Sequence, residues 1–157
     1  MYINPDKASA YFASGYNCAE SMLLASCDAL KISCEYFPRI ASCVGAGLSL
    51  DGEACGIATG GLLAIGLLTG RVRPEDSNDI AYYYGSLYME KFRELRGSHL
   101  CRDITKTDFT KIEGLNAWTT EKIPENICIP LMREAVEILS SILEEIQALH
   151  SLQKRTF

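Results

Sequence analysis

The chain has 157 residues, of which 48% are hydrophobic and 22% charged, so it has enough apolar material for one folded domain with a single core. Its formal net charge is −5, and its 15 Lys and Arg residues form no long basic block. Because a protein that neutralises phosphates needs a basic face, we do not expect nucleic-acid binding.

Capping residues predict two helices near the N-terminus. Asn4, followed by a proline, is typical of a helix start, and this helix should end near 14–15. A second helix follows at once, in which Asn17 is the cap and Glu20 completes a capping box. Cys18 therefore falls in the first turn of the second helix.

The middle of the chain is predicted as a short helix, a loop and an apolar helix. A short helix is expected within 33–44, a glycine-rich connection at 45–53 and a helix from about Glu53 to Leu68. Since the helix over 54–69 has no polar stripe, we expect it to be central and buried on most faces. The uncharged stretch is at the short limit for a membrane span and is rich in glycine, so a buried helix is favoured over a span.

The C-terminal half is predicted to hold two long helices. The first opens at 74–76 and ends at Gly97, residues 98–123 form a short helix and loops, and the last helix runs from Pro130 to Leu152. We expect the apolar seam of the last helix to exceed what a small bundle buries, so a homodimer or higher oligomer is predicted. The seam consists of Met132, Val136, Leu139, Leu143, Ile146, Leu149 and Leu152.

These patterns predict an all-α fold, a single-domain helical bundle of about five or six helices over 1–157. No β-hairpin signature, parallel βαβ rhythm, repeat or linker is visible. The residues after Met1 lack a basic stretch that leads into an apolar one, so no secretory signal is indicated and a cytoplasmic location is expected.

Four of the seven cysteines lie at or near predicted helix starts: Cys18, Cys55, Cys101 and Cys128. The positive end of a helix dipole and its unpaired N–H groups stabilise a thiolate, which makes such cysteines candidate nucleophiles or metal ligands. Cys55 has the clearest position and is the predicted attacking thiolate, with Cys18 next. Cys101 and Cys128 would resolve the intermediate that the attacking thiolate forms, or relay electrons. The sequence alone leaves open whether the four converge.

For the remaining cysteines and polar groups, structural or surface roles are favoured over roles in a functional site. Cys27 and Cys43 are interpreted as core residues, and Cys34 is left undecided. His99 could be a base or ligand near Cys101, although a surface residue is the more frequent case. The chain contains no CxxC, GxGxxG or P-loop, so a thioredoxin-like site, a zinc ribbon and a nucleotide site all lack their local signatures.

The chain resembles the C_GCAxxG_C_C family of redox-active proteins in four places. These are the segments GYNCAES, GEACGIATGGLLAIGLLTG and GSHLC, and a cysteine that precedes an amphipathic C-terminal helix. The resemblance covers roughly 10–140 and places the family cysteines on the same four positions and its glycine motif on 56–60. Ile57 stands where the family usually has Ala. The resemblance implies a redox role, and a looser similarity to part of a haem-containing cytochrome family leaves an iron–sulfur centre open. Without CxxCH, covalent haem is not expected.

Three functions remain open at this point. The first is an enzyme-like thiol–disulfide or electron-transfer protein that acts on a redox partner or a small thiol or disulfide substrate. The second is a binding module in which the four cysteines, Cys18, Cys55, Cys101 and Cys128, hold an iron–sulfur cluster or zinc. The third is a structural or partner-binding helical protein with incidental cysteines.

Overall fold

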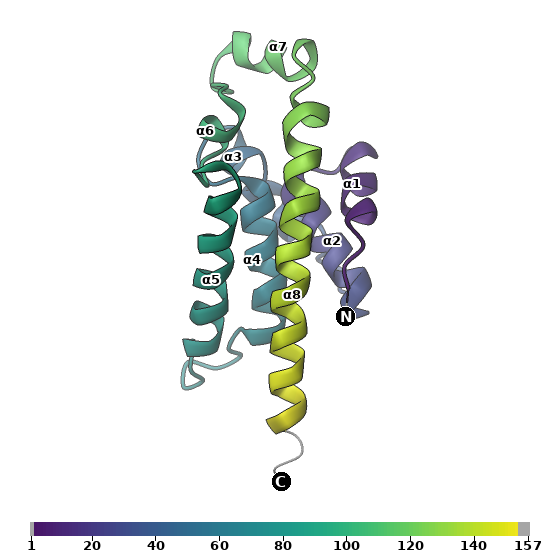
Figure 1. Ribbon diagram of the computed structural model, residues 1–157, viewed down its shortest axis with the longest axis vertical. Helices are drawn as coiled ribbons and strands as arrows, with labels where there is room; N and C mark the ends of the chain where they lie inside the picture. The colour runs from purple at the N-terminus through teal and green to yellow at the C-terminus, as the bar shows by residue number, and fades with distance from the viewer. Residues whose placement is uncertain (1, 154–157) are drawn as a thin grey trace.

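The computed structural model describes residues 2–153, which form a helical bundle (Figure 1). Its elements are α1 (Pro5–Ala13), α2 (Cys18–Leu30), η1 (Arg39–Val44), α3 (Ala46–Ser49), α4 (Gly56–Thr69), α5 (Asp79–Arg96), α6 (Cys101–Thr105), α7 (Ile112–Thr120), η2 (Pro124–Cys128) and α8 (Ile129–Gln153). Within the described residues the only β-structure is one isolated bridge, so the all-α prediction is confirmed. Six of these helices have at least nine residues and four are shorter, slightly more than predicted.

Helix α4 is the central element of the bundle. It packs against α2, α5 and α8, while α1 covers α2 and α8 (Figure 1). Ile57, Ala64 and Ile65 are buried in the main core, as expected for a helix without a polar stripe. In the part of the chain that the structure describes, neither α4 nor any other helix is long and apolar enough to cross a membrane.

Glycines let α4 approach its neighbours closely. A methyl group at Gly60 would lie 2.6 Å from the carbonyl oxygen of Ala19 in α2, and one at Gly61 would lie 2.4 Å from the Tyr88 ring in α5. The Tyr88 hydroxyl donates a hydrogen bond of 3.2 Å to the Ile57 carbonyl, which satisfies this buried polar group. Small side chains on α4 therefore set its distance to both helices.

The two predicted N-terminal caps are present. The Asn4 side chain accepts the N–H of Asp6, and the Asn17 side chain accepts the N–H groups of Ala19 and Glu20. The Glu20 carboxylate in turn accepts the Asn17 N–H at 2.8 Å, which completes the capping box. This local chemistry makes Cys18 the first residue of α2.

Two predicted helix starts are wrong, because other hydrogen bonds take the backbone. The segment 52–55 pairs with 99–102, so α4 begins at Gly56 and Cys55 is its cap. Residues 74–78 form turns, because the Asp76 carboxylate accepts the N–H groups of Val72 and Arg73, and α5 begins at Asp79. The predicted end of α5 at Gly97 is confirmed by its left-handed φ of 73°.

The seam on α8 faces its own bundle. Five of its members are fully buried within one chain: Met132, Val136, Leu139, Leu143 and Ile146. The contacts of α8 with α1, α4 and α5 provide this burial. Leu149, by contrast, is partly buried and Leu152 is 64% exposed. Burial within one chain therefore accounts for most of the seam, and the homodimer or higher oligomer stays a prediction.

Candidate functional site

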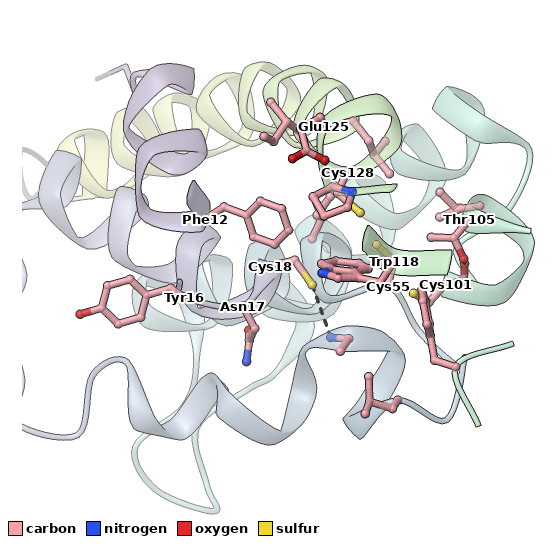
Figure 2. A pocket seen from close by; sticks show the side chains of 18 of the residues that line it. Phe12, Tyr16, Asn17, Cys18, Cys55, Cys101, Thr105, Trp118, Glu125 and Cys128 are labelled. Carbon is pink, nitrogen blue, oxygen red and sulfur yellow. Dashed lines mark hydrogen bonds between the residues drawn. The ribbon is translucent and has the colours of Figure 1, made fainter. Parts of the chain in front are cut away.

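The four cysteines singled out by the sequence line one cavity of about 650 Å³. Most of its lining residues lie at or near the starts of α2, α4 and α8 and in α3 and α6. These elements meet at one end of the bundle in Figure 1. Figure 2 shows the sulfurs of Cys18, Cys55, Cys101 and Cys128 gathered around it. The sequence leaves the convergence of these four distant cysteines open, and the structure places all of them along one cavity. All seven cysteines of the chain are free thiols.

Cys18 reaches the cavity because α2 and α4 touch at their N-terminal ends. A methyl group at Gly56 would lie 2.2 Å from the Cys18 Sγ and 2.9 Å from the Cα of Gly45. Only glycine leaves room for the sulfur there. The first glycine after Cys55 therefore places the Cys18 thiol directly beside the start of α4.

Two short extended segments hold Cys55 and Cys101 together. The Cys55 N–H donates to the His99 carbonyl at 2.8 Å, and the Cys101 N–H donates to the Glu53 carbonyl at 2.7 Å. Arg102 clamps the same contact, since its guanidinium donates to the Asp51 and Gly52 carbonyls and pairs with the Glu53 carboxylate at 2.7 Å. This ion pair makes Glu53 a structural partner of Arg102.

A left-handed helical turn forms one wall of the site. Every residue from 46 to 50 has a positive φ, between 50° and 74°. For residues other than glycine this conformation costs about 1–2 kcal/mol each, and such strain is typical of functional sites. The turn aims the N–H of Ala46 at the Cys18 Sγ, 3.4 Å away (Figure 2). It also packs Gly47 against Cys101, where a methyl group would lie 2.7 Å from the Cys101 Cβ.

Cys128 enters the site from η2, a single π-helical turn that leads into α8. Single π-helical turns are rare in proteins, and those that occur are often found at functional sites. Behind the cavity, Cys128 packs against a small core cluster that contains Cys101, Phe109 and Ile123. Residues 98–123, which contain α6 and α7, thus supply side chains that pack against Cys101 and Cys128 and that line the cavity.

The expectation that helix dipoles would lower the pKa values of these thiols is wrong for the reduced protein. Burial raises the pKa of Cys55 well above its usual range and that of Cys101 to about 12, and the charge of the Cys18 thiolate adds to both shifts. Cys128 is shifted upward for the same two reasons. The free-energy cost of removing a thiolate from water is therefore larger than the stabilisation that the helix dipoles provide.

Cys18 differs from the other three in the number of N–H groups around its sulfur. Burial raises the pKa of Cys18, but the backbone N–H groups of Ala46, Ala19, Cys18 itself and Gly56 oppose that shift. The side chain of Cys18 is half-buried, whereas Cys55 is 6% and Cys101 7% exposed. A negative charge in the site is accommodated best on Cys18.

The other three cysteines lie outside the cavity. Cys27 is buried in a second core cluster with Leu23 and Ala41, as predicted. Cys43 was expected in the core, but it is exposed, because it lies in the 3-10 turn η1 with its side chain directed to solvent. Cys34, left undecided by the sequence, is also exposed.

Exposure predicts which thiols react first with an alkylating reagent. At neutral pH, Cys34 and Cys43 should take up N-ethylmaleimide in a fast phase of two equivalents per reduced chain, because both are open to solvent. The cavity thiols should follow at least about tenfold more slowly, since burial keeps them protonated. Mass spectrometry of quenched peptides would measure both phases, and Cys55 labelled in the fast phase would contradict the prediction.

Four thiols match the ligand number of an iron–sulfur or zinc site, provided that their sulfurs can surround one point. Among residues 2–153, no three of the His, Cys, Asp and Glu side chains are placed to hold one metal ion. The four cysteines share a cavity without meeting at a point inside it. The reduced arrangement therefore does not fit a single-ion zinc centre.

Sequence reasoning missed the aromatic wall of the cavity. Trp118 packs edge-on against Phe12 at 6.3 Å and against Phe109 at 5.7 Å between ring centroids, and all three line the cavity with Tyr16. Figure 2 shows the Trp118 indole next to the cysteines. The single tryptophan of the chain, in a segment with little helical periodicity, was the one available signal.

The fold and the site define a helical protein with four convergent thiols in one cavity. The chain matches the C_GCAxxG_C_C family, described as "putative redox-active protein", over residues 16–142, and it belongs to this family. A redox-related role follows at this general level. The comparisons with curated proteins and with solved structures returned no match.

Proposed function

We propose that this chain is a thiol–disulfide redox protein whose cavity cysteines exchange electrons with a small disulfide substrate. The observation that carries the proposal is the convergence of Cys18, Cys55, Cys101 and Cys128 on one cavity. Thiols that are incidental to a fold scatter among the core and surface, as Cys27, Cys34 and Cys43 do. The proposed setting is the reducing cytoplasm, where the thiols would be regenerated.

Cys18 is the proposed attacking group, in place of Cys55, which the sequence favoured. Backbone N–H groups surround its sulfur, it is more exposed than Cys55, and its charge opposes ionisation of the other three thiols. Cys18 therefore ionises before them. Its thiolate attacks one sulfur of the substrate disulfide, the substrate S–S bond breaks, and the leaving thiolate takes up a proton.

Cys55 is the proposed resolving residue, because the Cys18 Sγ rests against Gly56, its neighbour in the chain. Cys55 loses its proton and attacks the Cys18 sulfur of the mixed disulfide, so the second substrate thiol is released. In sum, two protein thiols and one substrate disulfide give one protein disulfide and two substrate thiols. Cys101 and Cys128 then relay electrons by exchange with the Cys18–Cys55 disulfide.

The test uses protein purified without oxygen, with Cys34 and Cys43 replaced by serine so that only buried thiols report. Titration with 4,4′-dithiodipyridine should release two thiopyridones for each disulfide formed, with a loss of about 2 Da per disulfide from the intact mass of the protein. Cys18→Ser should slow the reaction at least about tenfold, whereas Cys27→Ser, a buried cysteine outside the cavity, should leave it unchanged.

Two results would overturn the proposal. In the first, the cavity thiols stay reduced in excess reagent after hours at pH 8. In the second, the protein is coloured and carries stoichiometric iron with acid-labile sulfide, which would favour the cluster-binding alternative.

A further inference from the structure

We infer that the substrate of this site is an uncharged small molecule with an aromatic or apolar body, and that anionic disulfides are excluded. This inference rests on the proposed function and names the class of substrate that the cavity would admit. It is carried by the side chains that line the cavity, apart from the thiols themselves.

The first observation is the charge of the lining. Among the described residues that line the cavity there is no Lys, Arg or His, and Glu125 is the one carboxylate. Glu125 adds to the rise in the pKa of Cys128, so its charge is felt inside the site. Arg102, which holds the Cys55 and Cys101 segments together, is already paired with Glu53. A substrate with carboxylate or phosphate groups would therefore lose its hydration without forming an ion pair in the cavity. It would also be repelled by the negative charge of Glu125.

The second observation is the shape and chemistry of the opening. Phe12, Phe109, Trp118 and Tyr16 present ring surfaces to the cavity, together with aliphatic residues such as Ile57 and Leu131. Trp118 is 36% and Tyr16 40% exposed, so both rings are accessible from solvent as well as from the cavity. Ring edges and faces of this kind favour a planar apolar group by stacking. A volume of about 650 Å³ is in the range of small-molecule sites.

The third observation ties the aromatic wall to the reactive sulfur. In Figure 2 the rings of Phe12 and Trp118, which pack against each other, lie close to the Cys18 thiol, and the Ala46 N–H donates to its sulfur. A disulfide whose ring stacks on this wall would present its S–S bond to Cys18. The same walls would keep the bond out of water during attack.

The experiment compares disulfides that share the same exchange chemistry and differ in charge. Reduced Cys34→Ser/Cys43→Ser protein would be mixed separately with three disulfides: neutral 4,4′-dithiodipyridine, dianionic dithiobis(nitrobenzoate) and anionic glutathione disulfide. The rate ratio of the neutral to the dianionic reagent should be at least about tenfold higher for the cavity thiols than for the exposed thiols. The exposed thiols Cys34 and Cys43 would be measured in a Cys18→Ser chain.

Glu125→Gln is the matched variant for the charge effect. It should raise the rate with the dianionic reagent several-fold more than the rate with the neutral reagent, because Glu125 is exposed and its replacement keeps the shape of the side chain. Equal ratios for cavity and exposed thiols, or a faster reaction with glutathione disulfide than with the neutral reagent, would overturn the inference.

Binding without chemistry separates this inference from the proposed function. In 1,2-di(4-pyridyl)ethane a carbon–carbon bond replaces the disulfide, so the molecule binds without reacting. It should change the fluorescence of Trp118, the single tryptophan of the chain, in a saturable way. No saturable change would overturn the ligand class. Saturable binding with thiols that resist oxidation by the neutral disulfide would support the ligand class and overturn the thiol–disulfide function.

Discussion

Replacing Gly56 with alanine is expected to destabilise the protein by about 3 kcal/mol, the upper end of the range for overpacked cores. The added methyl group would lie 2.2 Å from the Cys18 Sγ and 2.9 Å from the Gly45 Cα, and the latter belongs to backbone that cannot rotate away. Urea unfolding of the reduced protein would measure the loss. Gly56→Ala should also impair the redox reaction, because the thiol of Cys18 must move.

Gly66→Ala is the matched control in the same helix. A methyl group there meets nothing within 4 Å, so the variant should gain about 0.5–1 kcal/mol from the higher helix propensity of alanine. In a Cys18→Ala background, the cost of Gly56→Ala should fall, because part of the clash is removed. Equal free energies of unfolding for the two glycine variants would show that α2 and α4 are not packed as described.

The reduced protein should lose stability as the pH rises above 9, and Cys101 should supply a defined share of that loss. Its pKa of about 12 in the folded state exceeds the ordinary thiol value of 9.0, so the unfolded chain releases this proton first. The stabilisation is complete below pH 9 and is lost as the pH rises through the folded-state value. With 1.36 kcal/mol for each pKa unit, the full contribution is on the order of 4 kcal/mol.

Comparison with Cys101→Ala isolates this effect from the other groups that titrate at alkaline pH. Under reducing conditions, the difference in unfolding free energy between the parent and Cys101→Ala should shrink by about 1.4 kcal/mol per pH unit above 9. Denaturant titrations at half-unit steps from pH 7 to about 10.5 would test this. Parallel stability profiles would mean that Cys101 is not held in its neutral form by burial.

Local signals in the sequence determine the ends of several helices. Asn4 and Asn17 cap the first two helices and Gly97 ends α5, because each acts through hydrogen bonds or φ angles within a few residues. The same local reasoning separated the four cavity cysteines from the other three, since each lies within a few residues of a helix start. The all-α class followed from helical periodicity alone.

The tertiary structure decided how those elements meet. Residues 52–55 look like the start of a helix, yet they pair with 99–102, which lie far away in the sequence, and that pairing delays α4 until Gly56. The left-handed turn at 46–50 is equally invisible in the sequence, because four of its five residues are not glycine and owe their backbone conformation to packing around the site.

Charge in the site is the clearest case of a tertiary effect that reverses a local one. A helix N-terminus by itself lowers a thiol pKa, and this local effect is the reason the sequence favours Cys55. Once four helix ends and a loop close around the thiols, water is removed from all of them, and burial raises the pKa of Cys55 instead. Capping and helix dipoles act over a few residues and can be read along the chain. Desolvation depends on which distant segments surround a group, and only the folded structure determines that.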